Sequence, residues 1–262
     1  MGWTIFGIIK SVVFILFILG AVVGSFLNVV GLRWDLPAGR HALSKFGGRS
    51  FCPNCKKVLS WWELVPVFSF CVLKARCRRC GAKISWQYPL VEIWTGLIFA
   101  TVPYIFIPVF CIYVVITIYD WKYKIIPDSL VYLAIFLSLG FRIFVSDFGF
   151  NAWDLAAGPV IFIFFASIWV LSRGRAMGFG DAKLGLSVGL LLGAPEGFSA
   201  IILAFWIGAL GSLSYIFFCK IGFIKNTEGL IMKSEVPFAP AIIVGAWISL
   251  VFHLNILHVA LF

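Results

Sequence analysis

Of the acidic residues that stand in or beside long apolar stretches of this 262-residue chain, where a charged side chain is costly, four are informative. They are Glu92, Asp120, Asp128 and Asp181. Two carboxylates brought together in a low-dielectric setting cannot easily both ionise, so they share a proton. The ionised member can then take a proton from water while the protonated member polarises a carbonyl, which is the chemistry of peptide hydrolysis. Chain order alone does not show which of these acids meet.

Each acid also has a structural interpretation. Asp128 follows a proline at the start of an apolar run, where its carboxylate would make a good helix N-cap, and Asp181 precedes another apolar helix and could cap it in the same way. For Glu92 a buried hydrogen-bonding role is favoured over a share in substrate or cofactor binding. Asp181 is distinguished by Gly178 and Gly180, whose unhindered backbone permits unusual φ angles and the close approach of another chain.

Four cysteines form two C-x-x-C pairs, Cys52 with Cys55 and Cys77 with Cys80, and 21 residues separate the pairs. Two thiolates on a tight turn can bind one Zn²⁺, and two such turns supply its four ligands. A zinc ion with four protein ligands has a structural and not a catalytic role. Cytosolic thiols stay reduced, so ligation is favoured there over disulfides; unligated thiols and redox pairs are the alternatives. Three cysteines lie outside this pattern: Cys71, Cys111 and Cys219.

The composition indicates what must position these groups. The chain is 62% hydrophobic and only 12% charged, which excludes a soluble globule. Its net charge of +10 would fit a nucleic-acid binder, but the basic residues cluster between apolar runs instead of forming a face on a soluble body. We therefore expect an all-α polytopic membrane protein that has the lipid bilayer, and no nucleic acid, as a partner.

The apolar runs predict about eight transmembrane helices. The run over 89–119 is too long for one crossing and is split because Pro103 and Pro108 interrupt it. The first run is treated as a membrane anchor and not as a cleaved signal peptide, because no basic segment precedes it. The expected spans are 5–30, 88–102, 104–119, 129–145, 153–171, 182–194, 198–218 and 238–258.

The basic residues support this topology. With the amino terminus outside and eight spans, 19 of the 21 Lys and Arg residues fall on the inner side. A seven-span alternative, with one helix over 89–119, would put Lys122 and Lys124 on the opposite side from the cysteines. The expected domains are a first transmembrane helix at 1–31, a cytosolic four-cysteine zinc-binding insertion at 32–87, similar to a zinc ribbon, and a transmembrane core at 88–262.

Taken in order, the motifs of nearly the whole chain resemble one family, the type IV prepilin leader peptidases of bacteria, relatives of the G-x-G-D intramembrane aspartic proteases. Small departures are Phe179, where another apolar residue is frequent, and Ala239, where glycine is common. The motifs are 24–29 (GSFLNV), the paired C-x-x-C segment, 85–92 (SWQYPLVE), Asp120 with Pro127 and Asp128, 178–184 (GFGDAKL) and 237–240 (PFAP).

The resemblance implies that Asp120 and Asp181 are catalytic and that Cys52, Cys55, Cys77 and Cys80 hold zinc. It implies a multi-pass enzyme of the bacterial inner membrane that cuts the leader from type IV prepilins or pseudopilins on the cytosolic side. Many such enzymes then methylate the new amino terminus with S-adenosylmethionine. Supporting or substrate-binding residues would be Gly178, Gly180, Lys183, Asp128 and Glu92.

Two other classes remain as alternatives. An ion-coupled transporter or channel would account for the intramembrane acids and the spans but not for the cysteine pairs. A non-enzymatic membrane scaffold would account for the cysteine pairs but not for the cost of the acids. The sequence does not indicate the natural substrate or the oligomeric state.

Overall fold

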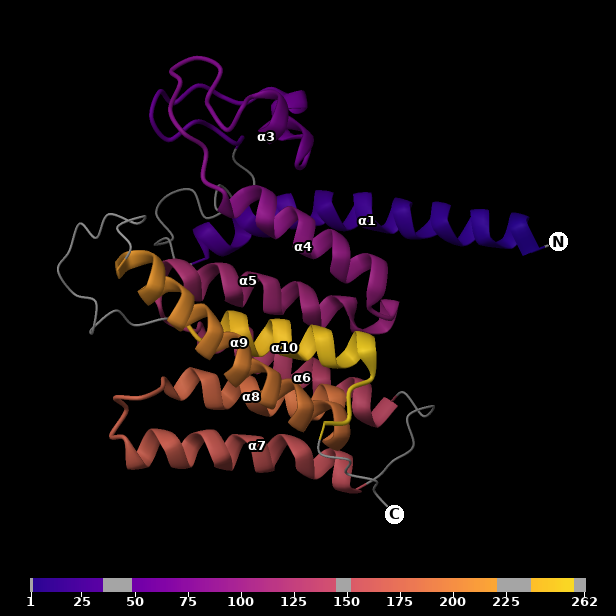
Figure 1. Cartoon of the computed structure of the whole chain (residues 1–262), viewed down its shortest axis with the longest axis vertical. Helices are drawn as coiled ribbons and strands as arrows, with labels where there is room; N and C mark the ends of the chain where they lie inside the picture. Colours follow the sequence, from indigo (N-terminus) through magenta and orange to yellow (C-terminus); the bar gives the residue numbers. More distant parts are fainter. Residues whose placement is uncertain (1, 35–48, 145–151, 221–236, 257–262) are drawn as a thin grey trace. The chain divides into compact units, whose positions relative to one another are not determined.

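The computed structural model describes residues 2–34, 49–144, 152–220 and 237–256. These residues are mainly helical, and within them β-structure is limited to two isolated bridges. The helices of 14 residues or more in the described ranges are α1 (Gly2–Arg33), α4 (Gln87–Thr101), α5 (Ile107–Tyr123), α6 (Asp128–Phe144), α7 (Ala152–Leu171), α8 (Phe179–Leu192), α9 (Ala194–Lys220) and α10 (Ala239–Phe252) (Figure 1).

These helices lie on the eight predicted apolar segments. In the described part of the chain, four helical segments are long and apolar enough to cross a membrane: Lys10–Arg33, Tyr104–Tyr123, Trp153–Leu171 and Ala194–Ser214. A shorter apolar helix covers Ala239–Phe252. The all-helical membrane class is therefore confirmed, with four candidate spans.

The long apolar run over 89–119 divides at its first proline. Val102 ends α4 with an extended backbone at φ −86° and ψ 137°, because a following proline disfavours the helical conformation. A short 3-10 turn, η2 (Tyr104–Phe106), leads into α5. A single helix over this run, the alternative to the split, is therefore wrong. Since α5 continues to Tyr123, past the predicted end at 119, Asp120 lies in its last turn.

The chain forms two compact units, Met1–Ile118 and Tyr119–Phe262, and α5 runs through the boundary between them. In the N-terminal unit, α1 packs closely on α4 through two glycines four residues apart. A Cβ at Gly24 would lie 2.8 Å from Oγ1 of Thr95, and one at Gly20 would lie 2.7 Å from Cβ of Phe99. Such small-residue pairs let helix backbones approach within a membrane.

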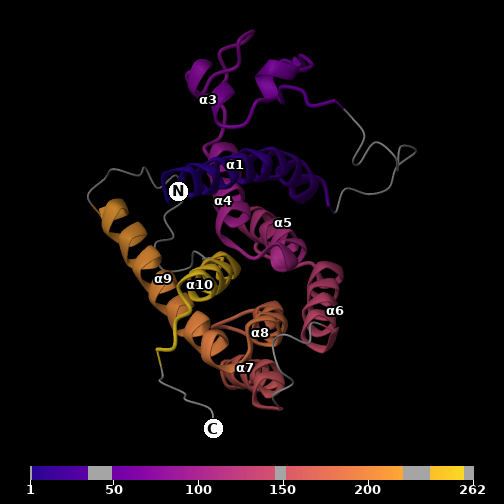
Figure 2. The same cartoon turned by 90° about the vertical axis from the view of Figure 1, so that its right-hand side faces the viewer.

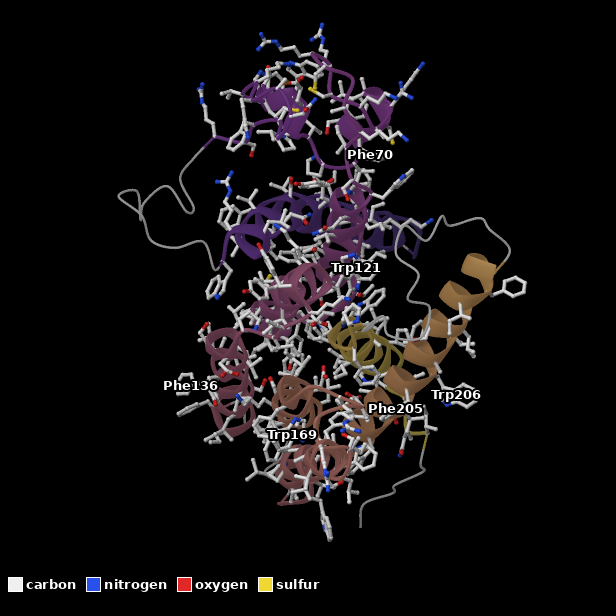
Figure 3. The ribbon with its side chains drawn as sticks, turned by 90° about the vertical axis from the view of Figure 1, so that its left-hand side faces the viewer. Phe70, Trp121, Phe136, Trp169, Phe205 and Trp206 are labelled. Carbon is white, nitrogen blue, oxygen red and sulfur yellow. The ribbon has the colours of Figure 1, made fainter. Side chains whose placement is uncertain are left out.

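Residues 49–86, here called the cysteine segment, connect to α4. This segment contains the 3-10 helix η1 (Trp61–Leu64) and the short helix α3 (Phe68–Val72). The ring of Phe70, labelled in Figure 3, packs edge-on against Trp86 with centroids 4.8 Å apart, so this contact joins α3 to the N-cap residue of α4.

In the C-terminal unit, α8 is the central helix. It packs against α6, α7, α9 and α10 (Figure 2). The contact with α7 is very close, since a Cβ at Gly189 would lie 2.7 Å from Cα of Gly158. The hydroxyls of Ser138 on α6 and Ser187 on α8 are 3.1 Å apart and form a buried hydrogen bond. The most buried helix of the unit is thus the one that carries Asp181.

Large apolar side chains cover the outside of the helices. Phe136 on α6 and Trp206 on α9 are 72% and 65% exposed and point away from their neighbours in Figure 3. This is the surface expected where helices meet lipid. The stretch between the predicted spans 198–218 and 238–258 lies almost entirely outside the described residues, as do residues 35–48 of the predicted zinc-binding insertion.

We expect Gly189→Ala to destabilise the protein, because the added methyl group would collide with the backbone of α7 and neither helix can move without opening the core. Overpacking of this kind costs about 1–3 kcal/mol. Gly140→Ala on α6 is the matched control, since a Cβ there meets nothing within 4 Å. Thermal unfolding in detergent should show a lower Tm for the first variant only; equal Tm values would contradict the close α7–α8 contact.

Candidate aspartate site and cysteine cluster

Asp120 and Asp181 come together in the C-terminal unit. Asp120 lies in the last turn of α5 and Asp181 in the first turn of α8, and they are 5% and 7% exposed. Their carboxylates are close enough to interact electrostatically. The sequence drew attention to four acids. The two that lie close together in the structure are the two that the family resemblance implies are catalytic.

The start of α8 fixes the Asp181 side chain. Gly178 is the N-cap residue, and its backbone N–H donates a hydrogen bond to the Asp181 carboxylate three residues on. Asp181 is the third residue of α8, so the prediction that it is the N-cap residue is wrong; its bond to the Gly178 N–H is one half of a capping box, in which the side chain reaches back to the N-cap backbone. Gly180 has a different role: a Cβ there would lie 2.9 Å from Cβ of Ile126, so glycine lets the loop after α5 rest on α8.

Asp120 is held from the other side by α10. The backbone N–H of Ala239, the first residue of α10, donates a hydrogen bond to its carboxylate. The second oxygen, Oδ2, is buried and has no hydrogen-bond partner among the described residues. A buried carboxylate oxygen is expensive to leave unpaired, so this atom is the unsatisfied group of the site.

Asp128 and Lys183 form a separate ion pair beside the aspartates. Nζ of Lys183 lies 2.6 Å from Oδ1 of Asp128, at the first residue of α6. The same Nζ lies 5.1 Å from the ring centroid of Tyr132 and 5.2 Å from that of Phe179. Asp128 therefore links α6 to α8, and its partner is Lys183 and not a second carboxylate.

Glu92 belongs to the N-terminal unit and has a structural partner. The backbone N–H of Val67 donates to Oε2 of Glu92 at 2.8 Å, and Glu92 is 7% exposed. The carboxylate on α4 thus anchors the residue that precedes α3. This is the buried hydrogen-bonding role favoured from the sequence.

The four cysteines of the two C-x-x-C pairs form one cluster. Their Sγ atoms all lie within 4.8 Å of one another, with 3.8 Å between Cys52 and Cys80 and 3.9 Å between Cys55 and Cys77. A tetrahedron with Zn–S bonds of about 2.3 Å requires sulfur atoms about 3.8 Å apart, so the geometry fits zinc.

The two turns of the cluster are built alike. Cys52 and Cys77 each donate from the backbone N–H to a carbonyl five residues on, at 2.9 and 2.8 Å, and an isolated bridge closes each turn, Phe51 with Val58 and Arg76 with Lys83. The backbone N–H of Ala82, helped by the side-chain amide of Asn54, lowers the pKa of the Cys80 thiol to about 6. These bonds favour the thiolate at Cys80, which is the form that binds metal, whereas burial and the neighbouring thiols of the cluster raise the pKa of Cys55 to about 11.

Two polar groups that the sequence reasoning missed support these elements. Glu63 accepts from Nζ of Lys57 and from the backbone N–H of Ser60, both at 2.8 Å, and these bonds lower its pKa. In the C-terminal unit, Asp154 pairs with Arg142 at 2.8 Å and accepts from the N–H of Ala194. The available signal was the same as for the other acids, a carboxylate next to an apolar run.

Comparison with known proteins gives matches over most of the chain. One family model, the bacterial Peptidase A24 N-terminal domain, matches residues 18–106, and a second, the type IV leader peptidase family, matches residues 105–213. A prepilin leader peptidase/N-methyltransferase of Bacillus subtilis (strain 168) is 30% identical over 88% of this chain and 91% of its own length. One of Neisseria gonorrhoeae is 29% identical over 88% of this chain and 87% of its own length. No solved structure gives a significant match.

We expect the purified full-length protein to carry about one zinc ion per chain, because four converging thiolates satisfy its tetrahedral preference. Cys80→Ser should lower the zinc content measured by elemental mass spectrometry and reduce the thermal stability. Cys71→Ser is the matched control, since this exposed cysteine lies outside the cluster. Full zinc loading of the Cys80→Ser protein would contradict the four-thiolate site.

Proposed function

Since the chain belongs to the type IV prepilin leader peptidase family, we propose that Asp120 and Asp181 are the catalytic pair with which it cleaves prepilin leaders. The enzyme is a peptidase with N-methyltransferase activity. Family membership favours this function over the transporter and scaffold alternatives. The observation that carries the proposal is the meeting of the two buried carboxylates, with Oδ2 of Asp120 left without a partner.

The pair would work by dividing base and acid between its members. One ionised carboxylate takes a proton from a water molecule, and the resulting hydroxide attacks the scissile carbonyl. The protonated carboxylate donates a hydrogen bond to the carbonyl oxygen and stabilises the negative charge that develops there. The proton is then delivered to the departing amine as the C–N bond breaks. The N–H groups of Ala239 and Gly178 keep both side chains in place without occupying all of their oxygens.

We place the site at the cytosolic boundary of an eight-span membrane domain. Asp120 lies in the last turn of its helix and Asp181 in the first turn of its own, so both stand at helix ends. In this topology the membrane is crossed by the four longer candidate spans and by four shorter helices of 14 to 17 residues, which are α4, α6, α8 and α10. The distribution of Lys and Arg then places these ends and the cysteine segment inside the cell.

The substrate would be a type IV prepilin or pseudopilin whose apolar helix lies in the bilayer. Membrane partition supplies affinity and brings the leader junction to the depth of the aspartates. Gly180 is covered by Ile126, so its role is to seat the loop after α5 and not to admit the substrate backbone. The Asp128–Lys183 pair and Gly178 support the start of α8.

The two implied cofactors differ in their fit. The cysteine cluster would hold zinc in a closed structural site that takes no part in bond cleavage. Methylation of the new amino terminus would use S-adenosylmethionine. The pocket beside the second C-x-x-C turn does not fit this donor, because its lining contains Lys74, Arg76 and Arg78 and no acidic side chain that could pair with the positively charged sulfonium.

Asp120→Asn and Asp181→Asn should each lower leader cleavage by roughly 10²- to 10⁴-fold, the usual contribution of a positioned acid or base. Asp128→Asn is the matched control: it removes a 63%-exposed partner of an ion pair worth at most about 1 kcal/mol, so its rate should fall less than about fivefold. The assay is mass spectrometry of a prepilin incubated with each variant in liposomes. Normal cleavage by a folded Asp120 or Asp181 variant would remove that residue from the pair.

With S-adenosylmethionine present, the mature pilin product should gain the mass of one methyl group at its new amino terminus. Omitting the methyl donor should leave cleavage unchanged and abolish the mass gain, because the two steps are chemically independent. A product that never gains mass, even with active peptidase and donor present, would contradict the methyltransferase step in this chain.

A further inference from the structure

The short helix α3 has an exposed apolar face. Phe68 and Val72 are 65% and 55% exposed, and Cys71 between them is exposed as well, whereas Phe70 points the other way and packs on Trp86. Residues at positions i, i+3 and i+4 share one side of a helix, so these three form a single outward face. A soluble domain rarely leaves such a face in water.

Contacts within the N-terminal unit fix the depth of this helix. The span Lys10–Arg33 of α1 contains Gly24, which lies nine residues, or about 14 Å, before Arg33. A Cβ at Gly24 would be 3.2 Å from Cα of Glu92, so Glu92 lies level with the inner part of that span. Oε2 of Glu92 in turn holds the N–H of Val67, one residue before α3. Helix α3 therefore starts about one side-chain length from Glu92, a residue of α4 that packs against the candidate span of α1 about 14 Å before the end of that span.

The backbone before α3 makes this attachment rigid. Val67 has φ 59° and ψ −48°, and the N–H of Phe68 bonds to the carbonyl of Pro66 at 2.5 Å, which is a γ-turn of the rare positive-φ kind. A β-branched residue adopts this conformation only when its surroundings impose it. The Val67 N–H in this turn bonds to Glu92, and the chain continues from the turn directly into α3.

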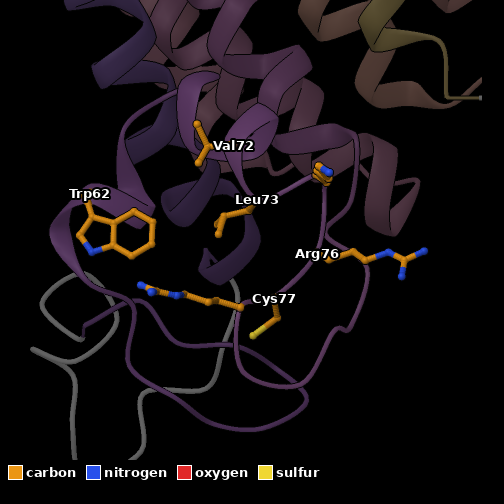
Figure 4. Close-up of a pocket in the computed structure, with 7 residues that line it drawn as sticks. Trp62, Val72, Leu73, Arg76 and Cys77 are labelled. Atoms are coloured by element: carbon orange, nitrogen blue, oxygen red, sulfur yellow. The ribbon is translucent and has the colours of Figure 1, made fainter.

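Basic side chains follow the apolar face. The residues after α3 include Lys74, Arg76 and Arg78, which line a shallow pocket together with the apolar Trp62, Val72 and Leu73 (Figure 4). The Arg78 guanidinium lies 5.1 Å from the ring centroid of Trp62. Over 49–86 there are eight Lys and Arg residues and a single acid, Glu63, which is buried against Lys57. The surface beside α3 is thus apolar and strongly cationic.

We propose that α3 lies in the interfacial layer of the bilayer, with Phe68, Cys71 and Val72 among the upper acyl chains and the Lys74–Arg76–Arg78 flank on anionic lipid headgroups. An apolar stripe next to basic residues is the pattern of interfacial helices. The depth set by Glu92 brings α3 to the bilayer boundary, where an anionic headgroup is the complementary charge. The cysteine segment is then held flat against the membrane and does not extend freely into water.

Native Cys71 provides a reporter in the full-length protein. A nitroxide is attached to Cys71 of the zinc-loaded Cys111→Ala/Cys219→Ala protein, with a Cys71→Ser version as the labelling control. The protein is placed in nanodiscs of phosphatidylcholine with or without phosphatidylglycerol. Electron paramagnetic resonance then measures collisions of the label with oxygen, which concentrates in lipid, and with a nickel chelate, which stays in water.

The expected result is a label that collides more with oxygen than with the nickel chelate. This preference should be greater in nanodiscs that contain phosphatidylglycerol. Lys74→Gln and Arg76→Gln should shift the label toward water, each weakening the docked state by about fivefold in the anionic nanodiscs.

Three results would overturn the proposal. A label as accessible to nickel as one in water would place α3 in the aqueous phase. A label protected from both reagents would place it against protein, either a second copy of the chain or another partner. A label that is fully buried in lipid, and whose accessibility changes neither with the phosphatidylglycerol content nor in the Lys74 and Arg76 variants, would show that anionic headgroups do not bind this surface.

Discussion

Buried or half-buried carboxylates that accept hydrogen bonds from backbone N–H groups are the interactions on which the helices of this chain depend. Glu92 receives the N–H of Val67, Asp154 that of Ala194, Asp120 that of Ala239 and Asp181 that of Gly178. Each bond joins a side chain to a residue at the end of a helix or just outside it, where backbone donors have no partner within the helix. In an apolar environment, burying a charged carboxylate and burying an unpaired N–H group both cost free energy. A hydrogen bond between the two groups offsets both costs.

Asp120 departs from this pattern, because one of its two carboxylate oxygens has no hydrogen-bond partner among the described residues. Asp154 uses both oxygens, one on Arg142 and one on Ala194, whereas Asp120 keeps Oδ2 unpaired while lying beside Asp181. Under the proposed function, the same class of interaction has two uses: a carboxylate with both oxygens bonded ties helices together, and the pair that contains the unpaired Oδ2 of Asp120 exchanges protons. The nearby Asp128–Lys183 bond stabilises the start of α8 without adding a third acid to the pair.

Sequence reasoning succeeded where the signal is local. The C-x-x-C spacing predicted the thiol cluster, and the apolar runs predicted where the helices lie, because hydrophobicity and knuckle spacing act over a few residues. Helix ends were less accurate: α8 begins at Phe179, three residues before its predicted start, with Gly178 as its N-cap residue. The bond from Val67 to Glu92 spans 25 positions and depends on an unusual γ-turn, so no local pattern could have indicated it.

If Asp120 and Asp181 act on one peptide bond, both must contact that bond in the enzyme–substrate complex. This is tested directly by electron cryo-microscopy of the Asp120→Asn enzyme with an uncleaved prepilin in nanodiscs. We expect the scissile carbonyl within hydrogen-bond reach, about 3 Å, of Asp181 and of the amide at position 120. A leader junction bound elsewhere, or residues 120 and 181 separated in the complex, would contradict it.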